Sequence, residues 1–554
     1  MTTASRLLAA TLLVSAACSA SGTKEAAPAP CAGVVCKALD SCHVAGQCEA
    51  STGSCTNPAK PDGTPCGTGL ACAGGACLPQ GTSVVEHHNG SRRTGLYVDA
   101  SLTQASAATF HVDPAFHAAV TGAVYAQVLY VTGGPGGRDV VIAATEENLV
   151  YALDAASGAA VWSRSLGAAV ARSSLPCGNI DPLGVTGTPV ADLAARRVYV
   201  AAMTTPDGGA TKKHLVYALS LDDGSVVSGW PVDVAAKVSF QGTAFQSAIQ
   251  NQRGALALLG GTLYVPYGGH YGDCGSYHGW IVGIPVADPA SPSGWATGAV
   301  GGGMWAPSGV ASDGSSLFTA TGNTFGAATW QGGEALLRFS AGPAFSGLAA
   351  DYFAPGNWKA LDAGDVDIGG TGPVLVDVPG ADPSELVVGL GKDGNIYLAG
   401  RADMGGIGGQ LAVARVASNE IINAAASYST AQGTYVVFKG DGTSCPAGQA
   451  GDLTAVRITA TSPPGIATAW CASQNGLGSP MVTSTDGRSQ VIVWSVGAEG
   501  DNRLHGFDGD TGRVVFAGGG AGDALGTVRR YHAPVLAKGR IFVGADGAVR
   551  ALVR

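Results

Sequence analysis

The sequence predicts an all-β protein whose main body is an eight-bladed β-propeller, preceded by a small disulfide-rich segment. Three observations predict this organisation. Glycine supplies 85 of the 554 residues, a strand pattern recurs along most of the chain, and 8 of the 13 cysteines crowd into one N-terminal stretch. Glycine favours tight turns because it adopts positive φ angles without steric cost, and 46% hydrophobic residues are enough to build a core.

The N-terminus has the features of an export signal. Arg6 supplies a positive end, and residues 7–17 form an apolar core that is too short to span a bilayer. The core ends at Cys18 in a sequence that resembles a bacterial lipobox, with the large aliphatic residue one position early. We therefore expect residues 1–18 to be a lipoprotein-type signal peptide with Cys18 as the lipidation site, and residues 19–30 to be a tether. Cleavage nearby, followed by full secretion, is the alternative.

The expected location follows from this signal. We expect an outer-membrane or cell-surface lipoprotein, or otherwise a periplasmic or secreted protein. No later segment reaches membrane-spanning length without an interrupting Gly or charge, so the lipid is the one expected attachment to a membrane.

Residues 31–79 combine an even number of cysteines with almost no apolar core, which favours a disulfide-stapled module. The eight cysteines are Cys31, Cys36, Cys42, Cys48, Cys55, Cys66, Cys72 and Cys77. Zinc is the alternative, but the segment has no paired Cys-x-x-Cys knuckles, and His43 is the one histidine among these cysteines. The spacing resembles short cysteine-rich repeats of bacterial surface proteins, which implies a spacer or adhesion role.

One strand pattern recurs from about Ala107 onward. Its clearest copy has a β-branched strand at 140–145, a second strand that ends at Asp154, and a third that ends with Trp162 after a Gly turn. A short strand of the type small-Pro-Val precedes each copy, and small residues fit the crowded centre of a radial array. The eight starts lie at 126–128, 188–190, 254–256, 306–308, 372–374, 424–426, 479–481 and 533–535. Self-similarity at this period predicts eight blades.

The two ends of the repeat region are complementary. The last copy stops at Arg554 after three strands, and an unassigned strand at about 107–112 precedes the first copy. We predict that this early strand completes the final blade and closes the ring, which removes the exposed sheet edges. An open solenoid is the alternative.

The repeats also resemble a known family. Copies of the form Tyr-Ala-Leu-Asp-x-x-x-Gly-x-x-x-Trp resemble those of pyrroloquinoline-quinone (PQQ) dehydrogenases and their non-enzymatic relatives, over residues 85–554. Further stretches, among them 251–253 and 391–394, resemble one quinoprotein-like branch. The resemblance implies a propeller like that of quinoprotein alcohol dehydrogenases. For an enzyme it implies PQQ over a Trp, Ca2+ held by a carboxylate and an amide, an Asp base and often a disulfide between adjacent cysteines.

The chain departs from that enzymatic pattern. It has no adjacent cysteine pair, no motif in which the catalytic Asp can be placed, and a shorter length than typical dehydrogenases. We expect its four propeller cysteines to pair as Cys177 with Cys274 and Cys445 with Cys471, in structural bonds between neighbouring loops. Free thiols are the alternative.

Two stretches carry candidate ligand-binding side chains. Residues 270–280 bring together His270, Asp273, His278 and Trp280, which could ligate a metal or hold a polar ligand. The alternative is a turn whose His and Asp bond loop backbone while the Trp packs between blades. Trp305 follows three glycines that would let the backbone approach a ligand near the channel.

A possible calcium loop lies further along the chain. Asp362, Asp365 and Asp367 precede two glycines in a pattern that resembles part of such a loop. The usual Glu at the twelfth position is absent, and aspartates also cap turns by themselves. Calcium at these residues is therefore one interpretation and a capped turn is the other.

Charge and motif content restrict the function. The net charge is −9 and no basic run appears, which excludes nucleic acid as an expected partner. The sequence has neither a Gly-x-Ser-x-Gly elbow nor a His-Glu-x-x-His pair. We expect a non-catalytic binding or scaffolding module that takes an envelope protein or polysaccharide as partner. The alternative is a PQQ-dependent oxidoreductase of alcohols or sugars, with Ca2+.

Overall fold

The computed structural model describes residues 83–554 without interruption. Before them it describes residues 31–38, 40–41, 43–48, 55–56, 65–67, 70–73 and 76–79. The chain divides into two compact units, Met1–Gln80 and Gly81–Arg554. The predicted lipidation site, Cys18, lies outside the described residues. No helix of the described part is long and apolar enough to cross a membrane.

The N-terminal unit contains a small antiparallel sheet. Its strands are β1 (Pro65–Gly67), β2 (Leu70–Ala73) and β3 (Ala76–Pro79). Disulfide bonds join Cys31 to Cys48 and Cys36 to Cys55, which confirms the disulfide prediction for these four cysteines. Cys42 and the side chains of Cys66, Cys72 and Cys77 lie outside the described part of the chain.

The unit Gly81–Arg554 is an eight-bladed propeller, as the repeat predicts. Blade 1 consists of β7 (Leu129–Val131), β8 (Val140–Ala144), β9 (Leu149–Asp154) and β10 (Ala160–Ser165), and blade 2 of β11 (Val190–Asp192), β12 (Arg197–Thr204), β13 (Lys213–Ser220) and β14 (Val232–Asp233). Blade 3 consists of β18 (Ala257–Leu259), β19 (Thr262–Gly269), β20 (Trp280–Pro285) and β21 (Ser293–Ala296). Blade 4 consists of β22 (Ala311–Ser312), β23 (Leu317–Thr321), β24 (Ala335–Phe339) and β25 (Tyr352–Ala354).

Blade 5 consists of β26 (Val374–Asp377), β27 (Glu385–Leu390), β28 (Asn395–Gly400) and β30 (Ala412–Arg415), and blade 6 of β31 (Ala426–Thr430), β32 (Gly433–Lys439), β33 (Leu453–Thr459) and β34 (Gly465–Ala472). Blade 7 consists of β35 (Met481–Ser484), β36 (Ile492–Val496), β37 (Leu504–Asp508) and β38 (Val514–Ala517). Blade 8 consists of β39 (Val535–Ala537), β40 (Arg540–Ala545), β41 (Ala548–Val553) and β5 (His111–Val112). Each predicted start lies at or just before the first strand of its blade.

Further short strands and helices are present besides the four-stranded blades. The strands are β4 (Leu96–Val98), β6 (Ala118–Ala119), β15 (Ser239–Phe240), β16 (Thr243–Ala244), β17 (Gln250–Asn251) and β29 (Gly406–Ile407). The helices are α1 (Gln104–Ala107), α2 (Val234–Lys237), α3 (Trp358–Gly364), and the 3-10 turns η1 (His87–Asn89), η2 (Pro135–Gly137), η3 (Arg172–Ser174), η4 (Ala349–Asp351), η5 (Ile368–Gly370) and η6 (Ala521–Asp523).

Tryptophans of the repeat join consecutive blades. Trp162 of blade 1 donates its ring N–H to the carbonyl of Leu221 in blade 2, at 2.9 Å. Trp470 of blade 6 donates to the carbonyl of Gly509 in blade 7, at 2.8 Å. The apolar faces of the blades are buried against one another, so each blade depends on its neighbours for its core.

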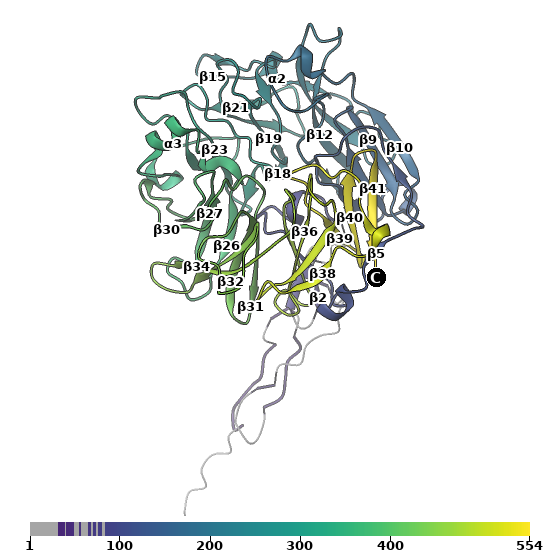
Figure 1. The fold of residues 1–554 in the computed structure, drawn as a ribbon, viewed down its shortest axis with the longest axis vertical. Coiled ribbons are helices and arrows are strands. Elements are labelled where there is room, and N and C mark those ends of the chain that lie inside the picture. The colour runs from purple at the N-terminus through teal and green to yellow at the C-terminus, as the bar shows by residue number, and fades with distance from the viewer. Residues whose placement is uncertain are drawn as a thin grey trace, which may run out of the picture. The chain divides into compact units, whose positions relative to one another are not determined.

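The ring closes through the early strand, as predicted. Val112 of β5 lies opposite Leu552 of β41, and β6 pairs with the same strand. Figure 1 shows β40 and β41 of blade 8 beside β9 and β10 of blade 1. The predicted strand at 107–112 begins later than expected, at His111. The reason is that Thr103 and Ser106 form a capping box that starts helix α1.

A second closure of the ring was not predicted from the sequence. Residues 84–98, here called the central segment, run along the innermost strands of the blades. Backbone groups of Val84, Val85, Ser91, Arg92, Thr94 and Gly95 pair in turn with Tyr130, Ala191, Ser312, Leu375, Ser427 and Val482. These partners belong to blades 1, 2, 4, 5, 6 and 7. The free edges of the inner strands are thereby hydrogen-bonded inside the ring.

Arg93 joins the central segment to two more connections. Its side chain is fully buried, and it donates to the carbonyls of Leu256 at 3.0 Å and Val310 at 2.7 Å. It also donates to the carbonyl of His87 and pairs with Glu86, at 2.9 and 3.0 Å. A charge without access to water is therefore fully hydrogen-bonded.

Candidate functional site

The candidate ligand-binding and metal-binding residues of the propeller lie on one face. Because neighbouring strands are antiparallel, the connections from second to third strand and from each blade to the next emerge on the same face, here called the loop face. Residues 270–279 connect β19 to β20, Trp305 follows β21, and residues 362–367 precede β26. The sequence candidates therefore share a face although they come from three connections.

The side chains of residues 270–280 are used to hold the loop itself. His270 bonds the carbonyl of Ala248 at 3.3 Å, and burial lowers the pKa of His270 to about 4. Asp273 accepts a hydrogen bond from Tyr277, at 2.7 Å. His278 bonds the carbonyl of Thr297 at 2.8 Å, and the buried ring of Trp280 packs against Phe245. This arrangement is the turn that the sequence offered as the alternative to a ligand site.

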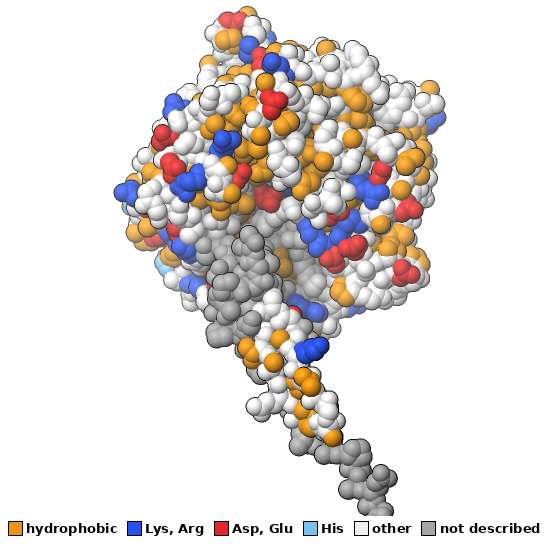
Figure 2. Space-filling model, turned by 180° about the vertical axis from the view of Figure 1, so that it is seen from behind, with side chains coloured by type: hydrophobic (Ala, Val, Ile, Leu, Met, Phe, Trp, Pro, Cys, Tyr) orange, Lys and Arg blue, Asp and Glu red, His pale blue; other side chains and the backbone are white. Residues whose placement is uncertain are grey.

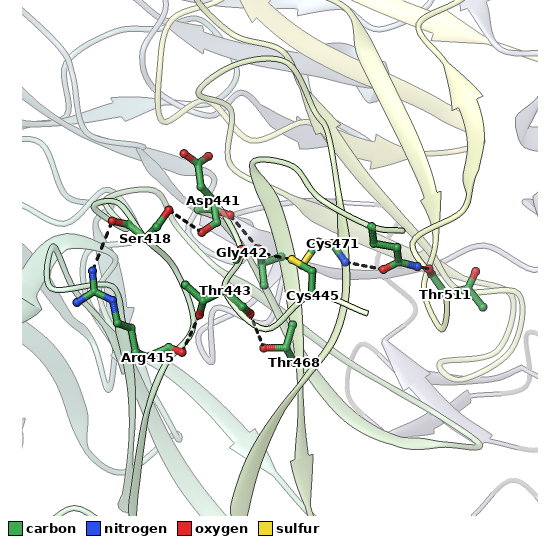
Figure 3. The surroundings of a disulfide bond; sticks show 12 residues. Arg415, Ser418, Asp441, Gly442, Thr443, Cys445, Thr468, Cys471 and Thr511 are labelled. Atoms are coloured by element: carbon green, nitrogen blue, oxygen red, sulfur yellow. Dashed lines mark hydrogen bonds between the residues drawn. A yellow bond between two sulfur atoms is a disulfide. The ribbon is translucent and has the colours of Figure 1, made fainter. Parts of the chain in front are cut away.

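Two disulfide bonds hold the loops around this face. Cys177 pairs with Cys274, and Cys445 pairs with Cys471, the pairing expected from the sequence. Figure 3 shows the second bond, with Thr468 donating to the carbonyl of Thr443 beside it at 3.2 Å. A Cβ on Gly442 would lie 2.5 Å from the sulfur of Cys471, so the bond packs directly on that glycine.

The three aspartates of the possible calcium loop bind protein groups. The stretch is helix α3 up to Gly364, and Asp362 within it accepts from the Thr324 hydroxyl at 2.8 Å. Asp365 pairs with Lys392 at 2.7 Å. Asp367 accepts from the ring N–H of Trp305 at 2.9 Å.

The bond between Trp305 and Asp367 joins two candidate sets that the sequence treats separately. Gly322 lies against it: a Cβ there would be 2.8 Å from Asp367 Oδ2 and 3.0 Å from Trp305 Nε1. Burial raises the pKa of Asp367 to about 6, although Lys392 opposes the rise. Burial and the charge of Asp367 raise the pKa of Glu334 to about 9. Near neutral pH the two carboxyls therefore present one negative charge beside Lys392.

A row of alternating cations and aromatic rings crosses the loop face. Lys392 lies over Trp305 at 5.5 Å from the ring centroid, and Arg253 lies 5.9 Å from the same ring. Arg253 is also 5.7 Å from the ring of Tyr531. Beyond it, Arg529 lies 5.8 Å from the ring of Tyr125. These six residues, Lys392, Trp305, Arg253, Tyr531, Arg529 and Tyr125, are called the axial row.

Arg253 differs from the other cations of this row. Lys392 pairs with Asp365, and Arg529 pairs with Asp546 at 2.6 Å. Arg253 is only 9% exposed, yet it has no ion pair or hydrogen bond within residues 83–554, and its buried Nε has no partner. The terminal nitrogens of Arg253 have no hydrogen-bond partner within residues 83–554 and are not among the fully buried atoms, so they are accessible to a ligand.

A small cavity lies beside Arg253. Its lining residues precede the first strands of blades 1, 2, 3, 4 and 8 or belong to the central segment, which places it on the propeller axis. They are His87, Tyr125, Thr186, Thr188, Arg253, Pro307 and Tyr531. The lining contains no carboxylate. Glu146, next to it, accepts from Gly184 and Thr186 at 2.8 Å, and burial raises the pKa of Glu146 to about 7.

The candidate aspartates of the loop face do not form a Ca2+ site in this arrangement. The aspartates that resembled a calcium loop are bonded to Thr324, Lys392 and Trp305. In the described part of the chain, no group of three or more His, Cys, Asp or Glu side chains could hold a metal. Two cations already lie over Trp305, one of the candidate cofactor-binding residues.

Comparison with solved structures places the fold in a class. The quinohemoprotein alcohol dehydrogenase of Pseudomonas putida aligns with a TM-score of 0.59 at 13% identity, over 85% of this chain and 79% of that chain. The corresponding enzyme of Comamonas testosteroni gives 0.57 at 14% identity, over 85% and 80%. A europium-containing methanol dehydrogenase gives 0.56 at 13% identity, over 84% and 90%. The fold is thus an eight-bladed propeller similar to those of quinoprotein dehydrogenases.

At such identities the likeness concerns the fold alone. No protein-family model matches the chain, and no curated protein matches it in sequence. The chemistry has to be argued from this chain's own residues.

Sequence reasoning missed Arg253, Lys392 and Tyr531 as site residues. The first two appeared only within stretches that resemble the quinoprotein branch. One local signal was present, the run Arg529-Arg530-Tyr531 in a chain with only 13% charged residues. Figure 2 shows how the charges are otherwise arranged on the face in view, with both signs interspersed.

Proposed function

We propose that this chain is a cell-surface or periplasmic lipoprotein whose propeller is a non-catalytic module that binds an envelope protein on its loop face. The composition of the axial row supports this proposal. Tyr, Trp and Arg are the residues that dominate the centres of protein–protein interfaces. Two further aromatic side chains on the same face are solvent-exposed, Tyr271 at 65% and Phe325 at 45%.

One observation carries the proposal: Arg253, at the centre of the row, is buried and has no partner of its own. The carboxyl groups nearby argue for the same role. Asp367 and Glu334 have raised pKa values, as catalytic acids often do. Both are buried, however, and they accept hydrogen bonds from Trp305 and from the Ile368 backbone N–H. They hold the loop face in shape rather than meet a substrate.

A photocrosslinking experiment tests the binding face. A photoreactive phenylalanine analogue replaces Phe325 on the loop face, or, as a matched control, Leu348, which is 66% exposed on the connection from β24 to β25 at the opposite face. We expect protein adducts from position 325 and none from position 348, in cells of the native organism. Equal adducts from both positions, or none from 325, would contradict the proposal. Adducts that resist protease and stain for carbohydrate would instead indicate a polysaccharide.

A second experiment addresses catalysis. The purified full chain is mixed with PQQ and Ca2+, and quinone absorbance and dye reduction are followed with alcohols and sugars. We expect neither stoichiometric binding nor turnover. Tight binding with turnover would make the chain a PQQ-dependent oxidoreductase.

The lipid anchor is tested separately. We expect the native protein to partition into the detergent phase and Cys18→Ser to remain in the aqueous phase. Identical partitioning of the native protein and Cys18→Ser would indicate a secreted or periplasmic protein without this anchor.

A further inference from the structure

We propose that Arg253 binds a carboxylate of the protein partner in the cavity on the propeller axis. This inference rests on the proposed function and adds the chemistry of the anchor: an acidic side chain or a C-terminal carboxylate that enters the cavity.

The fold satisfies a buried guanidinium elsewhere. Arg93 donates to the carbonyls of Val310, Leu256 and His87 and pairs with Glu86. Arg253 lies in the same propeller and has none of these. Since a guanidinium is a strong donor to carboxylates, we expect the accessible terminal nitrogens of Arg253 to find their partner on another molecule.

Other groups of the cavity also have free hydrogen-bonding capacity. Nε2 of His87 is buried and has no partner. Within residues 83–554 the hydroxyls of Tyr125 and Tyr531 make no hydrogen bond. All of these groups line the cavity beside Arg253. Burial lowers the pKa of His87 well below its usual range, so its ring is neutral. One cation and several uncharged polar groups thus surround a single small space.

The complement of this lining is a monoanion with two oxygens. A planar guanidinium binds a carboxylate through two parallel N–H···O bonds. Glu146 interacts with Arg253, and because burial raises the pKa of Glu146 to about 7, this carboxyl is protonated below that pH. The single positive charge of Arg253 then favours a carboxylate over a doubly charged phosphate. The cavity has room for about one water molecule, so it takes only the oxygen end of a carboxylate whose remaining atoms lie outside it.

Binding of small probes to the full chain tests this inference. The probes are N-acetylglutamate amide, N-acetylglycine, glucuronate and inorganic phosphate, with N-acetylglutamine amide as the uncharged isostere. Binding is measured by calorimetric titration at constant ionic strength. We expect N-acetylglutamate amide or N-acetylglycine to bind about 10- to 100-fold more tightly than the isostere. The stronger of the two distinguishes a side-chain carboxylate from a chain terminus.

Matched variants assign the effect to Arg253. Arg253→Gln is expected to remove the preference for the carboxylate. Arg530→Gln, which removes a loop-face arginine that is already paired with Glu499, is expected to retain it. Far-ultraviolet circular dichroism of both variants checks that the propeller is folded. A carboxylate preference that survives in folded Arg253→Gln, or equal binding of acid and amide, would overturn the inference.

The remaining outcomes also decide the question. Tighter binding of glucuronate or phosphate than of both peptide probes would overturn the protein carboxylate and identify a different occupant. Loop-face protein adducts together with no carboxylate preference would refute this inference and leave the proposed function intact. Absence of adducts at position 325 would refute the proposed function itself.

Discussion

Replacing Arg93 and Arg253 by methionine, one at a time, is expected to change the stability of the propeller in opposite directions. Methionine has a similar length and no charge, so each replacement keeps most of the packing. Both arginines are buried within the same ring, at 0% and 9% exposure. They differ in hydrogen bonding and in exposure, since Arg93 is fully enclosed whereas Arg253 keeps a small accessible surface.

The magnitudes follow from the partners of each guanidinium. Without Arg93, the carbonyls of Val310, Leu256 and His87 lose their donor, and each buried unsatisfied group costs about 1–3 kcal/mol. Together with the loss of the Glu86 pair, we expect Arg93→Met to lower the free energy of unfolding by roughly 3–5 kcal/mol.

Arg253→Met removes a charge that has no partner. Relief of its burial is worth about 1–3 kcal/mol, against the loss of two cation–π contacts of about 0.5 kcal/mol each. We therefore expect the free energy of unfolding to be unchanged or to rise by up to about 2 kcal/mol. Greater stability in the absence of a ligand is common when a functional residue is replaced.

The assay is equilibrium unfolding of the full chain in urea without reductant, followed by tryptophan fluorescence and circular dichroism. Extrapolated free energies are compared between the two variants and the native protein. The reasoning is refuted if Arg253→Met is destabilised as much as Arg93→Met. An Arg93→Met variant as stable as the native chain would refute the role given to the central segment.

Three further predictions concern the supports of the loop face. Gly322→Ala introduces a Cβ against the Trp305–Asp367 bond and is expected to lower the free energy of unfolding by about 1–3 kcal/mol, as measured in urea. Gly522→Ala, where nothing lies within 4 Å, is the control and should change it little. Burial raises the pKa of Glu146 from 4.5 to about 7. Between these two pH values the carboxyl is protonated in the folded state and ionised in the unfolded state. The free energy of unfolding therefore falls as the pH rises from 4.5 to 7. The free energy of unfolding of Glu146→Gln should accordingly equal that of the native protein below pH 4.5 and exceed it by about 3 kcal/mol above pH 7. A difference between the two proteins that does not change with pH would exclude a raised pKa. Replacing Cys445 and Cys471 together by serine opens a loop of 26 residues and should lower the free energy of unfolding by about 3.5 kcal/mol. An unchanged free energy of unfolding would mean that the bond does not form in the native protein.

The propeller was predictable because its information is local. Each blade begins with a start of small residues, and Trp162, Trp295 and Trp470 lie on the fourth strands of blades 1, 3 and 6. The bond from Trp162 to the next blade shows why this Trp recurs. Strand 107–112 was predicted too long because the capping box at Thr103 competes with the strand. The central segment was not predictable. Its backbone hydrogen bonds go to six different blades within fifteen residues, so it has no period of its own.

The candidate site, unlike the blades, could not be predicted from residues that are close together in the sequence. His270, Asp273 and His278 are close in sequence and look like ligands, yet a tight loop uses them to satisfy its own backbone and side chains. Arg253 and Tyr531 are far apart in sequence, and nothing in either neighbourhood marks them as a pair. They meet only because every connection between blades emerges on one face around one axis.

The central segment and the candidate site are physically continuous. His87 belongs to the segment that pairs with the inner strands, and the same residue lines the cavity beside Arg253. The residues that close the ring therefore also form part of the wall on which a carboxylate would rest. A ligand bound there would hydrogen-bond to groups supported by five blades and by the central segment. The propeller thus supplies a site whose geometry is fixed before binding, and in which little conformational entropy remains to be lost when the partner arrives.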